Sequence, residues 1–583
     1  MRATALASFK FPKIASLGIV WLALAAQASP VFAQQSSPQP QRIDPQQPGR
    51  QIDANEAEQR RREKPQPRIQ RLAAPSPRVS GAPMFVLRSV TVQGATAIPA
   101  RAIAKAYRKN LGRTVSQKDL QNIATAISDL YRAAGFHLSR AIIPPQDVQG
   151  GRLRIRVIEG AIADVRIKGN DVKKYGLASH FKALARERPS RLKTVERALL
   201  LANDVPGLRI SDAAFEEIGS GTGRFRLIVS VETWSVFISS GIDNFGTDAA
   251  GPLQSFSSVY FNSALIAGDA LGLSASTVPD AVNDLRYGRA TYDLPIGSDG
   301  ARIGAVGSFG EVRPDDSRRQ FDTRTASQAF ELRGSIVPIK ARDTSLTLAA
   351  AFALNDEREE DTSGTIYQDR VRTVSLLADY KLHDTLAGWN YVTLGLKQGL
   401  DGFGATPAAD PLSSRTGATP NFTVYSFAYS RHQPLFGPWS IKGQAYGQLA
   451  SGPLFSSQSF SLGGPAFGPG YYSGDNGFAG LFELRFSQNI NQKLLKSYQL
   501  YGFIDGGTTW NEDYAQRSSL SSAGAGVRFE LADDWRGSVS FAVPVSYSSK
   551  SDEFRSSRVL FSLSKSFKLC PSRSGLQCSH AEP

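Results

Sequence analysis

The chain has 583 residues, of which 41% are hydrophobic, 20% charged and 10% aromatic, with 67 Lys and Arg against 52 Asp and Glu. At about 100–200 residues per domain, it forms several domains or one large domain with appendages. Its mean hydropathy is −0.23. Only one apolar run, near the N-terminus, approaches the roughly 20 residues of a membrane helix, which excludes a polytopic helical membrane protein. The 52 Gly, 32 Phe and 18 Tyr favour β structure, in a soluble protein or in a membrane barrel.

Residues 1–33 have the composition of a secretory signal peptide. Three basic residues and no acid precede an apolar stretch at 14–28, and small residues ending at Ala33 come before the polar Gln34. We expect cleavage after Ala33; the alternative is an uncleaved membrane anchor. Cleavage would remove three positive charges from the formal net charge of +15 and leave +12. Because export separates this basic chain from nucleic acid, we expect no nucleic-acid partner.

Residues 34–83 are predicted to form a linker. They are rich in Gln, Pro, Ser and Arg and contain almost no large apolar residue, so they cannot bury a core. Within the linker, residues 53–63 are helix formers with acids ahead of arginines, an order that suits the helix dipole. We expect a short polar helix there, or a solvated run of charges.

The two cysteines of the chain lie in a C-terminal tail, residues 568–583. Cys570 and Cys578 are close enough in sequence to close a small disulfide loop in an oxidising compartment. Such a loop would add little stability, because it crosslinks few residues. The sequence therefore does not predict a disulfide scaffold.

Two small α+β modules are predicted at 84–160 and 161–233. In the first, 86–92 is predicted as a strand, apolar residues recur at helical spacing over 120–131 after a Ser116 N-cap, and two further strands follow. The second module repeats this order in degenerate form. Two modules in tandem fit the pattern better than one large domain.

Residues 234–567 alternate between apolar and polar residues without intervening helical patterns. The alternation is clearest over 539–547, and the last segment ends in an aromatic residue, Phe567. At roughly 20 residues per strand and connection, this part predicts about sixteen strands, each long enough to cross a bilayer when tilted. A soluble array of β-sandwiches is the alternative. The signal peptide and the lack of structural cysteines favour a transmembrane antiparallel β-barrel.

Short motifs in the modules and in the barrel form a specific combination. In the two modules, the motif residues are Tyr131, Gly135, Arg140, Pro145, Gln146, Glu159 and Gly160, then Arg197, Pro206 and Gly207. In the barrel, the motifs lie at 243–246, 268–269, 292–295 and 503–507. With these motifs, the chain resembles the outer-membrane transporters of two-partner secretion, the filamentous-haemagglutinin and haemolysin secretion-activation family, over roughly residues 85–567. The resemblance implies that both modules are POTRA domains.

One stretch departs from the family pattern. The family has a long sixth extracellular loop that folds into the barrel lumen, with a glycine pair and an Arg-Gly-Tyr or Arg-Gly-Phe tip. The corresponding residues here are Gly463, Gly464, Pro469, Gly470, Tyr471 and Asp475, so a proline takes the arginine position. In the family this arginine pairs with an acid of the inner wall, and Asp505 stands at that position. We expect loop six with its usual ion pair absent or replaced. Asp505 then has to find another cation, stay hydrated or take up a proton.

The resemblance also implies a location and a function. Such a transporter lies in the outer membrane of a Gram-negative bacterium, surrounded by lipid, with its POTRA domains in the periplasm; we expect a monomeric barrel. Its partner is a large exoprotein with an N-terminal secretion domain, which the POTRA pair captures and the lumen conducts in unfolded form. Loop six and an N-terminal helix serve as plugs, and the candidate helix is 53–63, tethered by the Pro-rich residues 64–83.

Other functions are less well supported. We expect no enzyme, no metal and no cofactor, because the five histidines are not spaced as metal ligands and no nucleophile motif occurs. The two modules argue against a passive porin. The closest alternative is an assembly or insertase factor for outer-membrane proteins from the same superfamily. Such factors usually carry more modules and lack the Pro-rich extension.

Overall fold

The computed structural model describes residues 44–52, 66–70, 81–490, 492–513, 517–547 and 556–569. The predicted signal peptide, the predicted plug helix at 53–63 and the cysteine-bearing tail from Cys570 onwards lie outside these residues. The described chain forms two small α+β modules and a closed β-barrel. This architecture confirms the predicted fold class.

The first module packs two helices against two small sheets. Its elements are β2 (Pro83–Val86), β3 (Ser89–Gln93), α2 (Ala100–Ala104), β4 (Thr114–Ser116), α3 (Gln117–Ala133), β5 (Arg140–Ile142) and β6 (Arg152–Ile158). The larger sheet has the order β3-β6-β5, and β2 pairs with β4. Helix α3 begins with a capping box between Ser116 and Asp119 and buries Leu120, Ile123, Ile127 and Tyr131. The apolar spacing predicted this helix correctly.

The strand predicted over 86–92 is wrong, because the chain changes partner in the middle of it. Leu87 is fully buried and donates its backbone N–H to the carbonyl of Arg113, next to β4. Arg88 donates instead to the carbonyl of Gly151, next to β6. The run is therefore split into β2 and β3, which belong to different sheets. The apolar pattern continues across the break because both halves cover the same core.

The second module has a four-stranded sheet and two helices. Its elements are β7 (Ala161–Lys168), α4 (Ala178–Phe181), α5 (Leu192–Asp204), β8 (Leu208–Glu217) and β9 (Arg224–Thr233). The sheet order is β1-β8-β9-β7, in which β1 (Arg68–Ile69) comes from the linker. Arg68 and Ile69 lie parallel to Asp212 and Ala213 of β8. The linker therefore supplies an edge strand, which its composition did not predict.

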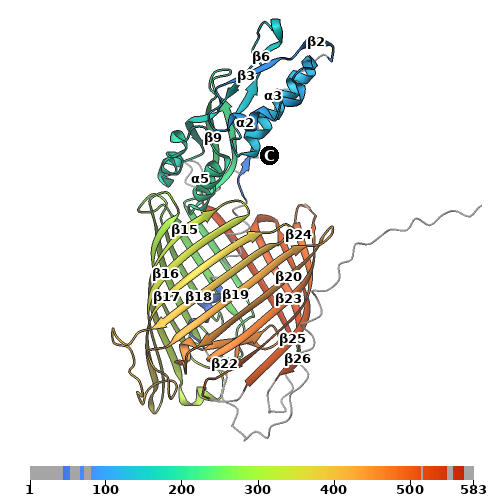
Figure 1. The fold of residues 1–583 in the computed structure, drawn as a ribbon. Coiled ribbons are helices and arrows are strands. Elements are labelled where there is room, and N and C mark those ends of the chain that lie inside the picture. The colour runs from blue at the N-terminus through green and yellow to red at the C-terminus, as the bar shows by residue number, and fades with distance from the viewer. Residues whose placement is uncertain are drawn as a thin grey trace, which may run out of the picture. The chain divides into compact units, whose positions relative to one another are not determined.

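Sixteen antiparallel strands close the barrel, as predicted (Figure 1). They are β10 (Val236–Asp243), β11 (Gln254–Asn262), β12 (Ala270–Thr277), β13 (Leu285–Ile296), β14 (Ala301–Val312), β15 (Arg324–Lys340), β16 (Thr344–Asp361), β17 (Gly364–His383), β18 (Trp389–Gly399), β19 (Thr423–Pro434), β20 (Trp439–Ala450), β23 (Asn476–Asn489), β24 (Leu495–Trp510), β25 (Arg517–Leu531), β26 (Trp535–Tyr547) and β27 (Arg558–Leu569). The first strand, β10, pairs with the last, β27, through eight residues, so the wall has no free edge.

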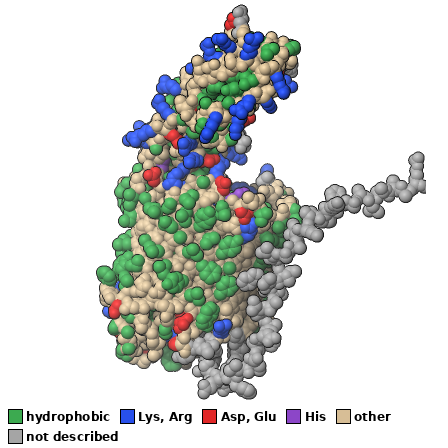
Figure 2. All heavy atoms as spheres, viewed as in Figure 1, with side chains coloured by type: hydrophobic (Ala, Val, Ile, Leu, Met, Phe, Trp, Pro, Cys, Tyr) green, Lys and Arg blue, Asp and Glu red, His purple; other side chains and the backbone are tan. Residues whose placement is uncertain are grey.

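Alternation along the strands gives the barrel two different faces. Large apolar side chains are exposed on the outer wall, among them Ile303, Phe330, Leu376, Leu394, Tyr425 and Leu500. Figure 2 shows such side chains gathered over the barrel. An apolar outer band around a more polar interior is typical of a transmembrane barrel. Among the residues that the structure describes, no helix is long and apolar enough to span a membrane.

Candidate functional site

The N-terminal segment 44–52 lies in the barrel lumen. Gln46 accepts a hydrogen bond at Oε1 from the Ser308 hydroxyl of β14 (2.9 Å), and its Nε2 lies 3.3 Å from the Ser327 hydroxyl of β15. Gln51 donates through Nε2 to Asp243 Oδ2 of β10 (2.8 Å). These contacts tie the segment to wall strands on both sides of the β11–β13 arc. We call residues 44–52 the lumen segment.

The helical part of the lumen segment begins at residue 47, ahead of the predicted 53–63. Asp44 caps it: its Oδ1 accepts from the Gln46 N–H (2.8 Å), and its carbonyl accepts from the Gln47 N–H (3.0 Å). Pro45 and Pro48 fall in or before the first turn, where a backbone N–H has no partner within the helix, so proline is tolerated. The prolines that favoured a linker therefore mark a helix start.

Glycine lets the lumen segment approach the wall closely. A Cβ on Gly49 would overlap the Tyr287 hydroxyl of β13, and a Cβ on Gly310 of β14 would overlap the Pro45 carbonyl oxygen. The backbone of the segment therefore lies directly against the Tyr287 side chain and against the backbone of Gly310. Either substitution would push the segment away from the wall.

Loop six forms a hairpin from β21 (Phe460–Gly464) and β22 (Gly468–Gly474). The hairpin belongs to an apolar cluster with inner-wall residues; its buried members are Phe460, Leu462, Ala466, Phe467, Ala479, Phe503, Leu520, Ala542 and Leu560. A Cβ on Gly463 would overlap the Gly468 carbonyl oxygen, and one on Gly464 would overlap Asp505 Oδ2. The predicted glycine pair therefore serves the hairpin turn and its contact with the wall.

Asp505 of β24 lies directly under this hairpin. Its Oδ1 accepts a hydrogen bond from the Ser522 hydroxyl of β25. Among the described residues, the Asp505 carboxylate makes no ion pair with an arginine or lysine. Pro469 and Gly470 lie in β22, close to the turn. The family pattern predicts that an arginine pairs with the acid at this position. Here the Ser522 hydroxyl contacts Asp505 instead.

A different arginine contacts the tip of the hairpin. Arg558, at the extracellular end of β27, donates through Nη2 to the carbonyls of Asn244 (3.3 Å) and Gly246 (3.0 Å). Its Nη1 would be 3.0 Å from a Cβ on Gly468. Arg558 therefore bridges loop six to the first extracellular loop. This contact joins the two ends of the barrel sequence.

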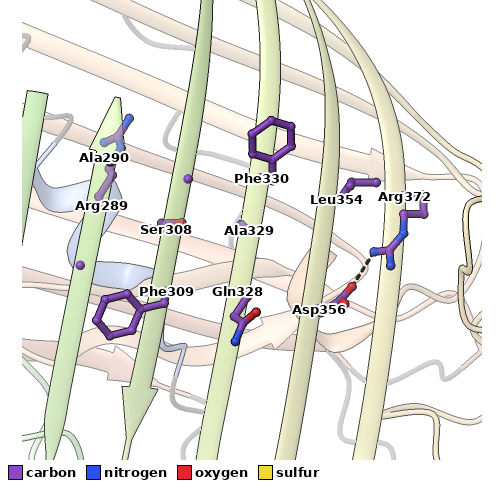
Figure 3. Close-up of a pocket in the computed structure, with 12 residues that line it drawn as sticks. Arg289, Ala290, Ser308, Phe309, Gln328, Ala329, Phe330, Leu354, Asp356 and Arg372 are labelled. Carbon is purple, nitrogen blue, oxygen red and sulfur yellow. Dashed lines mark hydrogen bonds and ion pairs between the residues drawn. The ribbon is translucent and has the colours of Figure 1, made fainter. Parts of the chain in front are cut away.

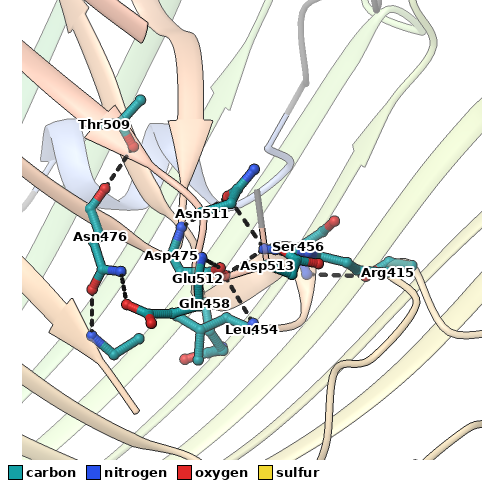
Figure 4. A network of polar contacts seen from close by, with 12 residues as sticks. Arg415, Leu454, Ser456, Gln458, Asp475, Asn476, Thr509, Asn511, Glu512 and Asp513 are labelled. Carbon is teal, nitrogen blue, oxygen red and sulfur yellow. Dashed lines mark hydrogen bonds and ion pairs between the residues drawn. The ribbon is translucent and has the colours of Figure 1, made fainter. Parts of the chain in front are cut away.

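The outer end of loop six is fixed by a buried polar network (Figure 4). Asp475 is fully buried and forms an ion pair with Arg415, which also pairs with Asp513. The Asp475 carboxylate further accepts from the backbone N–H groups of Leu454 and Glu512, both at 2.9 Å. Residues from three loops of the barrel, 400–422, 451–475 and 511–513, are joined at this carboxylate. Asp475 is one of the candidate site residues predicted from the sequence. Arg415 is not among them, because no motif surrounds that residue in the sequence.

Between the lumen segment and loop six lies a cavity of about 920 Å³. Its lining combines cations and aromatic rings; it includes Arg50, Arg528, Arg558, Tyr446, Phe460 and Tyr501. The Arg528 guanidinium lies 3.6 Å from the centroid of the Tyr501 ring and pairs with the buried Glu483 at 2.9 Å. The lumen is therefore polar and partly open, with both inserted elements at its boundary.

In the first module, Tyr131 and Glu159 meet at the core. The Tyr131 hydroxyl donates to Glu159 Oε1 (2.7 Å), and the backbone N–H groups of Thr96 and Ala97 donate to the same oxygen at 2.7 and 2.8 Å. Burial acts to raise the pKa of the Glu159 carboxyl, but these hydrogen bonds outweigh it and hold the pKa below its usual value. Burial, together with the bond to Glu159, raises the pKa of Tyr131. The motif therefore fastens helix α3 to the end of β6.

The other motif residues of this module shape its turns and its sheet. Gln146 donates to the carbonyl of Arg154 (2.7 Å) and accepts from the N–H of Arg154 (2.7 Å), the two bonds that a paired strand would make beyond the end of β5. Pro145 precedes it in the connection. Gly135, with a φ of +88°, follows the helix α3, and a Cβ on Gly160 would overlap Leu138. These residues are structural in this fold.

Arg140 joins the two modules. Its guanidinium pairs with Glu217 of β8 at 2.8 Å, and a second oxygen of Glu217 lies 3.0 Å away. Phe136 and His137 also face the second module. The Arg191 guanidinium lies 5.5 Å from the centroid of the Phe136 ring, and the ring centroids of His137 and Phe215 are 5.0 Å apart. Burial lowers the pKa of His137 to about 4. The junction is therefore an ordered contact between the modules.

Helix α5 joins the second module to turns of the barrel. Arg197 donates to the carbonyl of Val337 (2.9 Å), and Glu196 and Asp204 pair with Arg342 (2.9 Å) and Lys340 (2.5 Å). Pro206 and Gly207 lie between α5 and β8. Gly207 has a φ of +69°, and a Cβ there would overlap Asn262 of β11. The second-module motif therefore marks a contact with the barrel.

Comparison with known proteins supplies the family. Residues 227–529 match the haemolysin secretion/activation protein ShlB/FhaC/HecB, and residues 85–160 match the POTRA domain, ShlB-type. Since the first of these matches covers more than half of the chain, the protein belongs to the haemolysin secretion/activation family. It is an outer-membrane protein, with its POTRA domain in the periplasm. The barrel turns that contact α5 are accordingly periplasmic, and the loops around Asp475 are extracellular.

Individual relatives are distant but cover most of the chain. The heme/hemopexin transporter protein HuxB of Haemophilus influenzae is 23% identical over 485 residues, 76% of this chain and 80% of HuxB. The outer membrane transporter CdiB of Dickeya dadantii is 23% identical over 480 residues, 80% of this chain and 84% of CdiB. The solved structure of CdiB from Escherichia coli superposes with a TM-score of 0.70 at 21% identity, over 90% of this chain and 99% of that one. The structural likeness supports the fold.

Proposed function

We propose that this protein carries one specific large exoprotein, in unfolded form, from the periplasm across the outer membrane. Support comes first from the family and from the relatives named as outer-membrane transporters. The observation that carries the proposal is the lumen segment. Its polar side chains form hydrogen bonds with the wall, and Pro45, Pro48 and Ile52 are buried as well. Each such bond contributes only about 0.5–1.5 kcal/mol net, and burial of Ile52 adds roughly 1.5–3 kcal/mol, so we infer that the segment can be released at a cost of several kcal/mol.

Capture is proposed to begin on the periplasmic modules. An extended segment that joins a sheet edge gains main-chain hydrogen bonds and needs little sequence specificity. The pairing of β1 with β8 supports this, because an extended stretch of the linker already occupies one edge of the second module. The N-terminal secretion domain of the exoprotein would bind in the same manner. The periplasm offers no ATP, so export is driven by binding and by folding of the exoprotein outside the cell.

Passage through the lumen is the second part of the proposal. The lumen segment would leave the barrel, and loop six would move or remain as a partial constriction beside the 920 Å³ cavity. The barrel is proposed to act as a monomer; in support, its wall closes within one chain and needs no strand from a second copy. The linker between the lumen segment and β1 would supply the slack for this movement, because β1 is held by β8. A chain in transit would then contact the cationic and aromatic side chains of the cavity.

The test is expression with and without the candidate exoprotein. A host that lacks this system receives the transporter together with a large repetitive exoprotein encoded beside it. Export that depends on the transporter is the expected result. An assembly factor for outer-membrane proteins, the alternative, would instead change the amounts of many other barrels and leave the exoprotein unaffected. In planar bilayers, deletion of residues 34–80 should raise ion conductance, and unchanged conductance would exclude a plug.

A further inference from the structure

The outer wall of strands β13–β17 carries a notch with an ordered arrangement of side chains (Figure 3). Two rows of paired residues run across these strands. One row is Gly288, Phe309, Gln328, Asp356 and Arg370, and the next, toward the periplasm, is Ala290, Gly307, Phe330, Leu354 and Arg372. All except Arg370 line a cavity of about 570 Å³. This volume lies within the range of about 300–1,000 Å³ typical of ligand pockets.

These rows face the membrane. The lumen segment contacts Ser308 and Ser327, so those side chains point into the barrel. Their neighbours Phe309 and Gln328 point outward, because side chains alternate along a strand. Phe309 and Phe330 are 53% and 42% exposed, which agrees with an outward direction. The notch is thus open to lipid.

Missing side chains create the notch. Gly288, Ala290 and Gly307 leave a shallow floor on two adjacent strands, with a phenylalanine ring at each side. A Cβ on Gly288 would overlap the Phe309 ring, so the glycine lets this ring lie flat against β13. No atom lies within 4 Å of the place where a Gly307 Cβ would be. The floor at Gly307 is therefore open space on an apolar wall.

The depth of the notch in the membrane follows from the rows of residues that adjoin it on either side. Toward the periplasm, the adjoining row is apolar at Leu332, Phe352 and Val374. Toward the outside, the adjoining row begins with Arg286 and contains Arg358. The notch therefore lies at the boundary between the hydrocarbon and the polar region of the outer leaflet. A ligand there must be apolar at one end and polar at the other.

The polar boundary is positively charged. Its acids are already paired with arginines: Glu311 with Arg324 (2.6 Å), Asp356 with Arg372 (2.6 Å), and Glu360 with Arg358. Two further arginines, Arg286 and Arg370, are exposed and have no ion pair among the described residues. They lie on opposite sides of the notch, on β13 and β17. Arg286 donates a hydrogen bond to the Asn283 side chain, which carries no charge. The notch is thus bordered by two arginines without an acidic partner among the described residues.

We propose that this notch binds one acyl chain of a phosphorylated glycolipid of the lipid A class, with Arg286 and Arg370 at the level of its phosphates. Lipid A fits because it is the anionic lipid of the outer leaflet and carries several acyl chains on one phosphorylated headgroup. The apolar floor receives a chain, and the arginines pair with phosphate oxygens. The site depends on the outer-membrane location and is independent of which protein is exported.

The experiment compares two glycine variants with the full-length protein. Gly307→Leu fills the notch, whereas Gly443→Leu, the control, places the same side chain at an open glycine of β20 elsewhere in the wall. Each protein is extracted in mild detergent, incubated with purified lipid A or with phosphatidylglycerol, and examined by native mass spectrometry. We expect the wild type and Gly443→Leu to retain lipid A. Gly307→Leu should retain it about tenfold less, as expected if roughly two methylenes lose their contact.

A second variant controls for the possibility that Gly307→Leu misfolds. Arg286→Gln with Arg370→Gln keeps the notch but removes both cations, and should lower the retention of lipid A while the heat-modified mobility of the folded barrel is unchanged. Equal lipid A retention by Gly307→Leu and wild type would overturn the proposal. Equal retention of phosphatidylglycerol and lipid A by the wild type, or no retained lipid A at all, would overturn it as well.

Discussion

The fully buried carboxylate of Asp475 forms an ion pair with the guanidinium of Arg415, which comes from a different extracellular loop. Arg415 is itself only 17% exposed, so the pair is shielded from water. The pair holds the outer end of loop six, at the opposite end of the hairpin from Asp505. Loop six is thus fixed near its base by an ion pair, and near its turn by apolar packing, with Arg558 close to Gly468.

Removal of the Asp475 charge should release the extracellular loops. In Asp475→Asn, Arg415 keeps only Asp513 as an acidic partner, and loss of one partner of a buried ion pair typically costs about 3–5 kcal/mol. We expect faster cleavage of loops 400–422 and 451–475 by protease added to intact cells. The matched control is Asp384→Asn, which breaks a partly exposed pair with Arg431 at the periplasmic end and should leave the protease protection of these loops unchanged. Equal protection of Asp475→Asn and wild type would contradict the anchoring role.

An arginine at the position of Pro469 should stabilise loop six through Asp505. Asp505 has a hydroxyl partner but no ion pair among the described residues. We expect Pro469→Arg to raise the unfolding temperature of the barrel, and Pro469→Arg with Asp505→Asn to lose that gain. A double-mutant cycle isolates the coupling between the two sites. If Pro469→Arg brings no gain in stability or in protease protection of loop six, an arginine at this position does not pair with Asp505, and the inference from the sequence is contradicted.

The Glu159 cluster predicts how the first module responds to acid. Because the hydrogen bonds hold the folded pKa of Glu159 below its unfolded value, they stabilise the module above the unfolded pKa. This stabilisation is lost as the pH falls through the folded pKa. Glu159→Gln should therefore destabilise the module by about 1–3 kcal/mol at neutral pH and reduce its sensitivity to acid.

The measurement is hydrogen exchange of helix α3 in the full-length protein between neutral and acidic pH. Tyr131→Phe serves as a milder comparison, because it removes one donor and leaves Thr96 and Ala97 in place. Its protection should fall between those of the wild type and Glu159→Gln. An acid response of Glu159→Gln identical to that of the wild type would show that Glu159 does not govern it.

The ion pair between Arg140 and Glu217 should fix the angle between the modules. Either Arg140→Glu or Glu217→Arg places like charges together and should loosen the junction. The charge swap that combines both substitutions should restore it. Limited proteolysis of the connection at 187–191 reports the difference. Both side chains are partly exposed, so we expect an effect of about 1 kcal/mol or less on stability.

Helical spacing was sufficient to predict helix α3, and alternation predicted the strands of the barrel, because these patterns reflect which face each residue buries. The number of strands came from the length of this part of the chain, and the signal peptide favoured a barrel over a soluble array. The lumen segment was not located, because Pro45 and Pro48 have the same composition signal in a linker and in the first turn of a helix. The split between β2 and β3 was missed because both strands cover one core. Arg415 could not be predicted, since it lies in a loop of Gly, Pro, Ser and Thr and meets Asp475 only through the closed barrel.

Among the motif residues, the sequence indicated importance but not role. Gln146 replaces a missing strand partner, Arg197 contacts barrel turns, and Tyr131 meets Glu159 across the module. Each role depends on a partner that is distant in sequence. A motif position therefore identifies a residue that is under constraint, and only the fold shows whether the constraint is a turn, a junction or a core contact.

The most direct test of the transport proposal is a tether between the lumen segment and the wall. Gln46→Cys with Ser308→Cys, in a Cys570→Ser and Cys578→Ser background, replaces a hydrogen-bonded pair by two thiols that a short, reducible bis-methanethiosulfonate crosslinker can join. A direct disulfide would be too short, because the Gln46 side chain spans most of the gap. The control pair, Ser258→Cys with Ser274→Cys, replaces hydroxyls 3.0 Å apart on β11 and β12 and leaves the lumen segment untethered. If the segment must leave the lumen, crosslinking should stop exoprotein export only in the first pair, and reductant should restore it. Undiminished export with a fully formed tether would contradict passage through the lumen.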